Sequence, residues 1–184
     1  IDADQIERAI TANTEAILVT HVFGLPCDTV KIEDIARRHG LKVIYDAAHA
    51  FGCVYKGKSL LDYGDISTCS FHATKVFHTV EGGCITTKDD ALAQKLSLLR
   101  SFGHIGDEYF SLGINGKNSE FHAAMGLVLL PKLEWIISER QKIYELYLQL
   151  LPPGTFSIAY QAERFEYNFS YLPILLKNET TVLS

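Results

Sequence analysis

Apolar positions along the first half of the chain follow two alternating spacings. Residues 6–10 and 32–36 repeat apolar side chains at helical spacing. Residues 16–19 and 42–45 are short apolar runs typical of buried strands, and the second run ends at Asp46. Because strands that alternate with helices form β-α-β units, the pattern predicts an α/β fold, a mostly parallel sheet with helices on both faces.

Two further strand-like runs, residues 67–71 and 84–87, follow this region. The loop between them holds Lys75 and is too short for a helical crossover, which favours an antiparallel direction for one of the two strands. Sheets of this kind bind ligands beyond the carboxyl ends of their strands. We therefore expect chemistry near Asp46 and in the segment after His21.

The second half of the chain is mainly helical before it changes character. A helix is predicted from Asp89, and a longer helical pattern over residues 119–150 is interrupted by Pro131, which should kink it or begin a second helix. Short extended pieces that are rich in aromatic residues follow, around Phe156, Tyr160, Phe169 and Tyr171. We predict the central part of a large cofactor-binding domain over 1–118, a long interdomain helix region over 119–150, and the beginning of an incomplete small domain over 151–184.

Composition excludes several classes of function. Seventeen basic and twenty-two acidic residues give a net charge of −5, which offers no basic surface for nucleic acid or an anionic membrane. No apolar run reaches the roughly 18 residues of a membrane span, and no signal peptide is visible at the start. The four cysteines lack metal-ligand spacing, so we expect free thiols in a reducing cytoplasm. The chain begins at Ile1 rather than Met, and we expect it to be a piece of a longer protein.

Asp46 and Lys75 suit an aldehyde cofactor that has a basic ring nitrogen. A carboxylate at a strand end can keep such a nitrogen protonated, and a partly buried lysine can form an imine with the aldehyde. Ser70 and Thr74 add hydroxyl groups that could hold phosphate oxygens. Taken singly, however, Asp46 could be a turn cap and Lys75 a solvated surface charge.

Two histidines, His49 and His72, lie near these residues in the sequence and raise the alternative of a metal site. The chain has neither an H-E-x-x-H motif nor a closely spaced H-x-H pair. We therefore predict no metal. The dinucleotide motif G-x-G-x-x-G is also missing from the sequence.

Taken in order, the motifs closely resemble those of the DegT/DnrJ/StrS family of pyridoxal phosphate-dependent sugar aminotransferases, over positions 1 to about 150. The matching segments are His21-x-x-Gly24 with Pro26, Asp46-Ala47-Ala48-His49-Ala50, Gly64-Asp65, Ser70-Phe71-His72-x-x-Lys75, Glu81-Gly82-Gly83, Leu99-Arg100-x-x-Gly103, and Gly113-x-Asn115-x-Lys117-x-Ser119-Glu120 with Ala123-Ala124. The resemblance implies the fold of the large domain of a type I pyridoxal phosphate enzyme.

The resemblance also implies roles for individual residues. Lys75 would bond covalently to the cofactor aldehyde and later move a proton between substrate and cofactor, while Asp46 would pair with the pyridinium nitrogen. His49 would lie against the cofactor ring, Ser70 would bind the cofactor phosphate, and His72 would belong to the same cofactor site. Asn115 and Lys117 would reach into the active site of a second subunit, which implies a homodimer with shared sites.

The implied reaction moves an amino group from a donor, usually glutamate, to a nucleotide-linked keto-sugar in amino-sugar or polysaccharide biosynthesis. Two alternatives stay open at this point: a sugar dehydratase with the same cofactor, and a regulatory protein that keeps the fold without turnover. Relatives that are dehydratases replace the lysine by histidine, so Lys75 favours the aminotransferase. The sequence leaves open the sugar, the carbon that receives the amine and the nucleotide.

Overall fold

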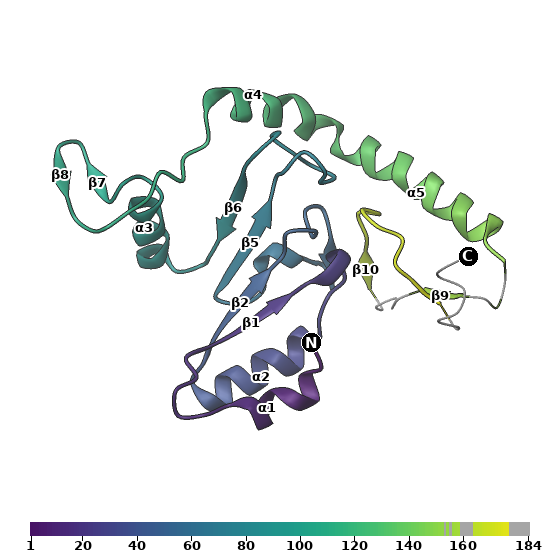
Figure 1. Cartoon of the computed structure of the whole chain (residues 1–184), viewed down its shortest axis with the longest axis horizontal. Helices are drawn as coiled ribbons and strands as arrows, with labels where there is room; N and C mark the ends of the chain where they lie inside the picture. The colour runs from purple at the N-terminus through teal and green to yellow at the C-terminus, as the bar shows by residue number, and fades with distance from the viewer. Residues whose placement is uncertain (153, 155, 159–163, 177–184) are drawn as a thin grey trace.

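A four-stranded mixed sheet is the centre of the computed structural model, which describes residues 1–152, 154, 156–158 and 164–176 (Figure 1). Its strands are β1 (Ala16–Thr20), β2 (Lys42–Asp46), β5 (Ile66–Ser70) and β6 (Gly83–Thr86), in the order β1-β2-β5-β6. The first three are mutually parallel, and β6 runs antiparallel to β5. The predicted α/β class, with a mostly parallel sheet, is confirmed.

One face of this sheet packs against two helices, α1 (Ile6–Ala9) and α2 (Thr29–His39), with the short 3₁₀ helix η1 (Ala3–Gln5) before them. The core between them consists of Ile6, Ile17, Val19, Ile32, Ile35, Ala36, Val43 and Tyr45. Helix α2 forms at this place because the Asp28 carboxylate accepts a hydrogen bond from the Lys31 N–H, at 3.1 Å, and because Gly40 ends the helix in the left-handed conformation.

The opposite face of the sheet is open in the part of the chain that the structure describes, so the predicted helices are seen on one face and not on both. Strand side chains alternate between faces, so Leu18, Ile44 and Ile66, which are register partners, share this second face. Leu18 is 67% exposed, and Ile85 on β6 is 51% exposed. This face also carries the Asp46 side chain, because Asp46 lies two residues beyond Ile44 on β2.

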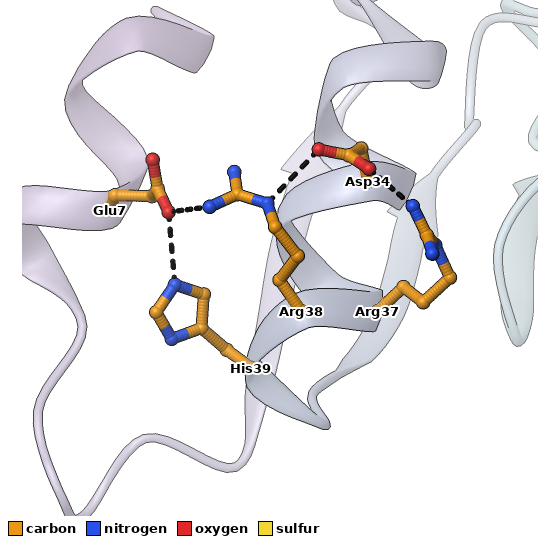
Figure 2. Close-up of polar contacts among 5 residues, drawn as sticks. All are labelled: Glu7, Asp34, Arg37, Arg38 and His39. Atoms are coloured by element: carbon orange, nitrogen blue, oxygen red, sulfur yellow. Dashed lines mark hydrogen bonds and ion pairs between the residues drawn. The ribbon is translucent and has the colours of Figure 1, made fainter.

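A charged network joins α1 to α2 at the surface (Figure 2). Glu7 of α1 pairs with Arg38 of α2 and lies 3.0 Å from His39 Nε2, while Asp34 pairs with Arg37 and with Arg38. Hydrogen bonds from Arg38 and His39 lower the pKa of Glu7. Exposed ion pairs contribute little stability one by one. The buried apolar contacts between α2 and the sheet are therefore the main source of its stability.

The segment after β6 forms a helix and a hairpin. Helix α3 (Asp90–Leu99) begins where the Asp89 carboxylate accepts the Leu92 N–H at 3.0 Å, as predicted from the acidic start of the pattern. The short strands β7 (His104–Ile105) and β8 (Glu108–Tyr109) then form an antiparallel hairpin that projects away from the sheet (Figure 1).

Two consecutive helices lead across the molecule above the upper ends of β5 and β6 (Figure 1). They are α4 (Glu120–Leu129) and α5 (Leu133–Leu150), joined by the 3₁₀ turn η4 (Leu130–Lys132), which contains Pro131. The predicted start at Ser119 and the predicted interruption at Pro131 are both confirmed, and the Ser119 hydroxyl accepts the His122 N–H at 3.4 Å.

Helices α4 and α5 contact the rest of the fold at glycines and expose much of their apolar surface. A Cβ at Gly126 would lie 3.0 Å from Thr79 Cγ2, and one at Gly52 would lie 3.1 Å from Ile137 Cδ1. By length and composition alone, Glu120–Leu150 could cross a membrane, with a mean hydropathy of 1.2 and 6% of its most apolar window buried. The uncharged stretch inside this segment, residues 121–131, ends at Lys132 and is shorter than the roughly 18 residues of an unbroken apolar span.

The described C-terminal residues return to the body of the fold. Strand β10 (Phe165–Glu166) pairs with β3 (Val54–Tyr55), which also pairs with β4 (Lys58–Ser59), and the 3₁₀ helix η3 (Leu60–Asp62) follows β4. Strands β9 (Phe156–Ile158) and β11 (Ile174–Leu176) form a separate pair. Tyr160 lies outside the described residues, and the boundary at 151 stays a prediction.

Replacing Ile32 by alanine should destabilise the protein. Ile32 is fully buried between α2 and the sheet, and truncation of such a residue lowers the free energy of unfolding by about 3 kcal/mol through lost burial and a remaining cavity. Val30 lies on the same helix but is 58% exposed, so Val30→Ala should change the free energy of unfolding by no more than about 0.5 kcal/mol. Urea denaturation of the full-length protein measures both, and equal effects would contradict the proposed packing.

Candidate active site

Asp46 is the last residue of β2, at the carboxyl end of the sheet. Its Oδ1 accepts the Ala48 N–H at 3.0 Å, so the turn-cap role and a role in chemistry coexist at this residue. Its backbone carbonyl accepts the His21 N–H at 2.9 Å, and the next residue, Ala47, donates to Thr68 O at 2.8 Å. These bonds to the chain before and after β2 fix the direction in which the carboxylate leaves the sheet.

His21 is fully buried directly beside this strand end. Its ring stacks on Tyr45 with the ring centroids 4.5 Å apart and the planes 10° apart. Its Nδ1 accepts the Cys27 N–H at 3.2 Å, so a neutral ring carries its proton on Nε2, which has no hydrogen-bond partner among the described residues. Burial lowers the pKa of His21 to about 4, and the Asp46 charge opposes this shift only in part.

His49 lies in the turn that follows Asp46 and is half-buried. The Tyr171 hydroxyl is 3.3 Å from His49 Nε2, and the two rings are 4.7 Å apart, whereas the buried Nδ1 has no described partner. Burial and the positive charge of Lys75 lower the pKa of His49, while Asp46 raises it. The charges of Asp46 and Lys75 therefore act on the same imidazole.

Lys75 is half-buried in the loop between β5 and β6, and its N–H donates to His72 O at 2.9 Å. Aromatic rings hold this loop: Phe77 stacks on Phe51 at 4.5 Å and meets the edge of Phe71 at 5.0 Å. Val76 and Phe77, which follow the lysine, are buried. The lysine is thus carried by an anchored loop and not by a free one.

Ser70 and His72 are at the start of the same loop. Ser70 is the last residue of β5, and its side chain shares the open face of the sheet with Thr68, the register partner of Asp46. Its Oγ accepts the His72 N–H at 3.3 Å. The exposed His72 has Nδ1 2.9 Å from Thr74 Oγ1 and Nε2 3.6 Å from Glu81 Oε1. Its ring nitrogens thus contact residues of its own loop.

Asn115 and Lys117 lie apart from these groups, on the exposed segment between β8 and α4. Lys117 Nζ donates to Asn115 Oδ1 at 2.8 Å and lies 3.9 Å from the centroid of the Phe102 ring. No contact of either residue with Asp46, His49 or Lys75 occurs within the described chain. Lys117 instead lines a cavity of about 1130 Å³ between β5, β6 and α3.

Asn168 and Tyr171 are part of the site, although their sequence positions did not indicate it. Asn168 is 1% exposed, and its Nδ2 donates to His49 O and to Phe51 O, each at 2.8 Å. Tyr171 contacts the His49 ring. The aromatic character of this segment was visible in the sequence, but its contact with a turn more than a hundred residues earlier was not.

Gly24 of the His21-x-x-Gly24 motif has a spatial reason to be glycine. Its φ is +79°, and a Cβ at this position would lie only 2.5 Å from His49 O. The chain after β1 therefore passes directly against the turn that carries His49. The motif joins two strand ends that make up the site.

The arrangement fits an aldehyde cofactor with a cationic ring nitrogen. The Asp46 carboxylate, the Ser70 hydroxyl and the Lys75 amine come from the ends of β2 and β5 and from the loop after β5, and the His49 ring in the turn after Asp46 has a buried Nδ1 that lacks a described partner. Unsatisfied buried polar atoms are rare in folded proteins, and a catalytic role is one of the reasons for which they occur. Among the residues described, no cluster of three His, Cys, Asp or Glu side chains could hold a metal ion.

Comparisons with known proteins agree on one family. A family model described as the DegT/DnrJ/EryC1/StrS aminotransferase family matches residues 1–183. A dTDP-4-amino-4,6-dideoxy-D-glucose transaminase of Shigella dysenteriae is 44% identical over 177 residues, which are 95% of this chain and 48% of that protein. A GDP-perosamine synthase of Caulobacter vibrioides is 40% identical over 154 residues, which are 82% and 42% of the two chains.

The comparison with solved structures also finds a protein that acts in sugar chemistry. The crystal structure of DesI in the presence of its TDP-sugar product has a TM-score of 0.87 and 32% identity, over 96% of this chain and 46% of that one. The chain thus spans about half the length of the relatives it matches.

The buried His21 should make stability depend on pH. The pKa of His21 is about 4 in the folded protein, whereas a histidine in the unfolded chain has a pKa of about 6.5. As the pH falls below about 6.5, the unfolded chain therefore binds this proton before the folded protein does. The free energy of unfolding decreases by about 3 kcal/mol in total between pH 6.5 and pH 4. Urea denaturation of the full-length protein between pH 7.5 and pH 4 measures this slope. His21→Gln should remove most of it, and His104→Gln, at a site on the β7–β8 hairpin, should retain it. Equal slopes in both variants would contradict a buried neutral His21.

Proposed function

The chain belongs to the DegT/DnrJ/EryC1/StrS aminotransferase family, and from this premise we propose that the whole protein is a pyridoxal phosphate-dependent aminotransferase. Pyridoxal phosphate is the cofactor of this family. In our proposal the protein transfers an amino group from glutamate to a nucleotide-linked keto-sugar. The observation that carries it is the parallel pairing of β2 with β5, which places Asp46, at the end of β2, beside the strand end from which the loop with Lys75 begins.

In the proposed reaction, some residues of the chain would bind the cofactor through their charge, and Lys75 would transfer protons. Bound cofactor would supply an electron sink for the carbon that gains or loses the amine. Asp46 would hold the proton of the cofactor ring nitrogen, and Lys75 would bond to the aldehyde and afterwards carry a proton to and from the substrate carbon. Ser70 would donate a hydrogen bond to the phosphate, and His72 would support the same end of the site.

His49 would line the site as an uncharged side chain. Its pKa is lowered by burial and by Lys75, so the imidazole adds no second positive charge beside the lysine near neutral pH. The hydroxyl of Tyr171 contacts Nε2, and Asn168 holds the backbone of the same residue. These contacts keep the ring in one orientation, so that its unpartnered Nδ1 can face the cofactor.

We propose a nucleotide-linked keto-sugar as the amino acceptor because the relatives reported above are named for amino-sugars linked to dTDP or GDP. Such a product would supply amino-sugar or polysaccharide biosynthesis. Lys75 favours transamination over the dehydratase alternative, since a dehydratase of this type has histidine at that position. The described cysteines are all free, which supports a reducing, cytoplasmic location.

We also propose a homodimer with shared active sites. Helices α4 and α5 and the hairpin segment expose large apolar side chains: Phe102, Ile105, Tyr109, Phe110, Leu112, Ile114, Phe121, Leu127, Val128, Leu130, Trp135, Ile143, Leu146, Tyr147 and Leu150. Large apolar side chains exposed in such number are typical of protein interfaces. Asn115 and Lys117 lie among these side chains and would reach the site of a second copy. The net charge of −5 disfavours binding to an anionic membrane or to nucleic acid, so neither is proposed as the partner.

Lys75→Ala in the full-length protein should abolish the absorbance of the bound cofactor and lower kcat by roughly 10²–10⁴-fold or more, because the covalent and proton-transfer group is lost. Asp46→Asn should keep the absorbance and lower kcat by about 10²-fold, because the ring nitrogen loses its charged partner. Turnover is measured by mass spectrometry of products from glutamate and a panel of nucleotide keto-sugars.

Lys95→Ala is the matched control for these two variants, since this exposed lysine on α3 lies outside the site. It should behave as the wild type. Wild-type turnover in Lys75→Ala would refute an aminotransferase. So would a wild-type protein whose cofactor absorbance does not change when any amino donor is added, and that result would favour a regulatory protein.

If the sites are shared, Lys117→Ala should also be inactive, and mixing it with Lys75→Ala should restore activity. Lys75→Ala and Lys117→Ala remove groups that, in our proposal, reach a given site from different subunits. After subunit exchange at equal amounts, half the dimers are mixed and each has one intact site, so about a quarter of wild-type activity should return. A mixture of Lys75→Ala with Asp46→Asn should not recover, because both groups belong to one subunit's half of the site. Recovery in neither mixture would contradict shared sites.

A further inference from the structure

Cys69 and Cys84 face each other across the antiparallel pair β5–β6 as register partners. Directly opposite residues in such a pair have their side chains on the same face of the sheet. Phe71 N–H donates to Gly82 O at 2.8 Å, and because hydrogen-bonded pairs recur at every second position, Cys69 and Cys84 form such a pair. Their Cα atoms are then about 5.5 Å apart, which lies inside the range of disulfide bonds.

The two thiols interact with each other. The neighbouring Cys84 thiol and burial raise the pKa of Cys69, whereas the Cys69 thiol lowers the pKa of Cys84. Cys69 is 6% exposed, and Cys84 is half-buried. Both residues line the cavity of about 1130 Å³ described above. Cys84 is thus both the more accessible of the two cysteines and the one whose thiolate is favoured. Reactive thiols combine these two properties.

The other two cysteines do not share this arrangement. Cys27 donates its thiol hydrogen to Thr20 O at 3.2 Å, and burial raises its pKa. Cys53 is fully buried in the small core beside Leu60, and burial raises its pKa to about 12. Neither has a cysteine as its register partner in the described sheets.

We propose that Cys69 and Cys84 form a redox modification site that hydrogen peroxide converts into a cross-strand disulfide. The Cys84 thiolate attacks one peroxide oxygen, the O–O bond breaks, and the leaving hydroxide takes a proton to become water. The Cys69 sulfur then attacks the Cys84 sulfenic acid, the S–O bond breaks, and the second hydroxide leaves as water with the Cys69 proton. Two thiols and one peroxide give one disulfide and two waters, and each sulfur is oxidised by one electron.

The disulfide would close the loop of residues 70–83. This loop contains Ser70, His72 and Lys75, so oxidation would restrain the segment that carries these side chains. The inference does not depend on the proposed function, because it rests on strand register, on thiol exposure and on the interaction between the two thiols. A thiol reductant would restore the open form by exchange.

The test uses the full-length protein treated with hydrogen peroxide, followed by alkylation of the remaining thiols under denaturing conditions and peptide mass spectrometry. The expected product is a linked peptide pair joining Cys69 to Cys84, lighter by two hydrogens than the separate peptides and separated by dithiothreitol. Cys27→Ser should give the same linked pair. Excess peroxide that yields no linked pair would overturn the proposal, and so would a link from either cysteine to Cys27 or Cys53.

A second variant tests the order of the steps. In Cys69→Ser the sulfenic acid of Cys84 has no resolving thiol, so dimedone should label Cys84 severalfold more than in the wild type. Cys84→Ser should leave Cys69 unlabelled. Labelling of Cys69 in place of Cys84 would overturn the assignment of the attacking thiol. If Cys69→Ser does not fold, the mapping of the wild-type protein decides the proposal by itself.

Discussion

The parallel pairing of β2 with β5 is the constraint on which the candidate site depends. It sets Asp46 opposite Thr68, and because side chains alternate along a strand, it places Ser70 on the same face as Asp46. The antiparallel return through β6 then keeps the loop with Lys75 at this end of the sheet. A shift of one residue in the β2–β5 register would turn the carboxylate toward the helices and separate it from the other groups.

Contacts from distant parts of the chain hold the loops of the site in place. Asn168 donates two hydrogen bonds to the turn after Asp46, and Tyr171 contacts the His49 ring. Glycines at 126 and 52 allow α4 and α5 to lie close to the loop after β5 and to this turn. Loops that carry function need such support because their own backbone forms few regular hydrogen bonds.

Much of the fold could be predicted from local patterns. The strand that ends at Asp46, the helix over 32–36 and the interruption at Pro131 depend on apolar spacing and on proline chemistry, which act over a few residues. The candidate residues Lys75 and Asp46 were also recognisable, since each lies in a motif beside a strand end. The contacts of Asn168 and the buried, neutral state of His21 were not, because both follow from neighbours more than twenty residues away.

The sequence by itself determined the α/β class, the order of its elements and the presence of a lysine, a carboxylate and histidines near strand ends, because hydrophobic period and motif spacing are properties of the local chain. Only the tertiary structure decided that the charges of Asp46 and Lys75 act on one imidazole, that Asn115 and Lys117 lie apart from that imidazole, and that Cys69 faces Cys84. Strand register and burial produce these outcomes, and both arise from pairing between segments that are distant in the chain.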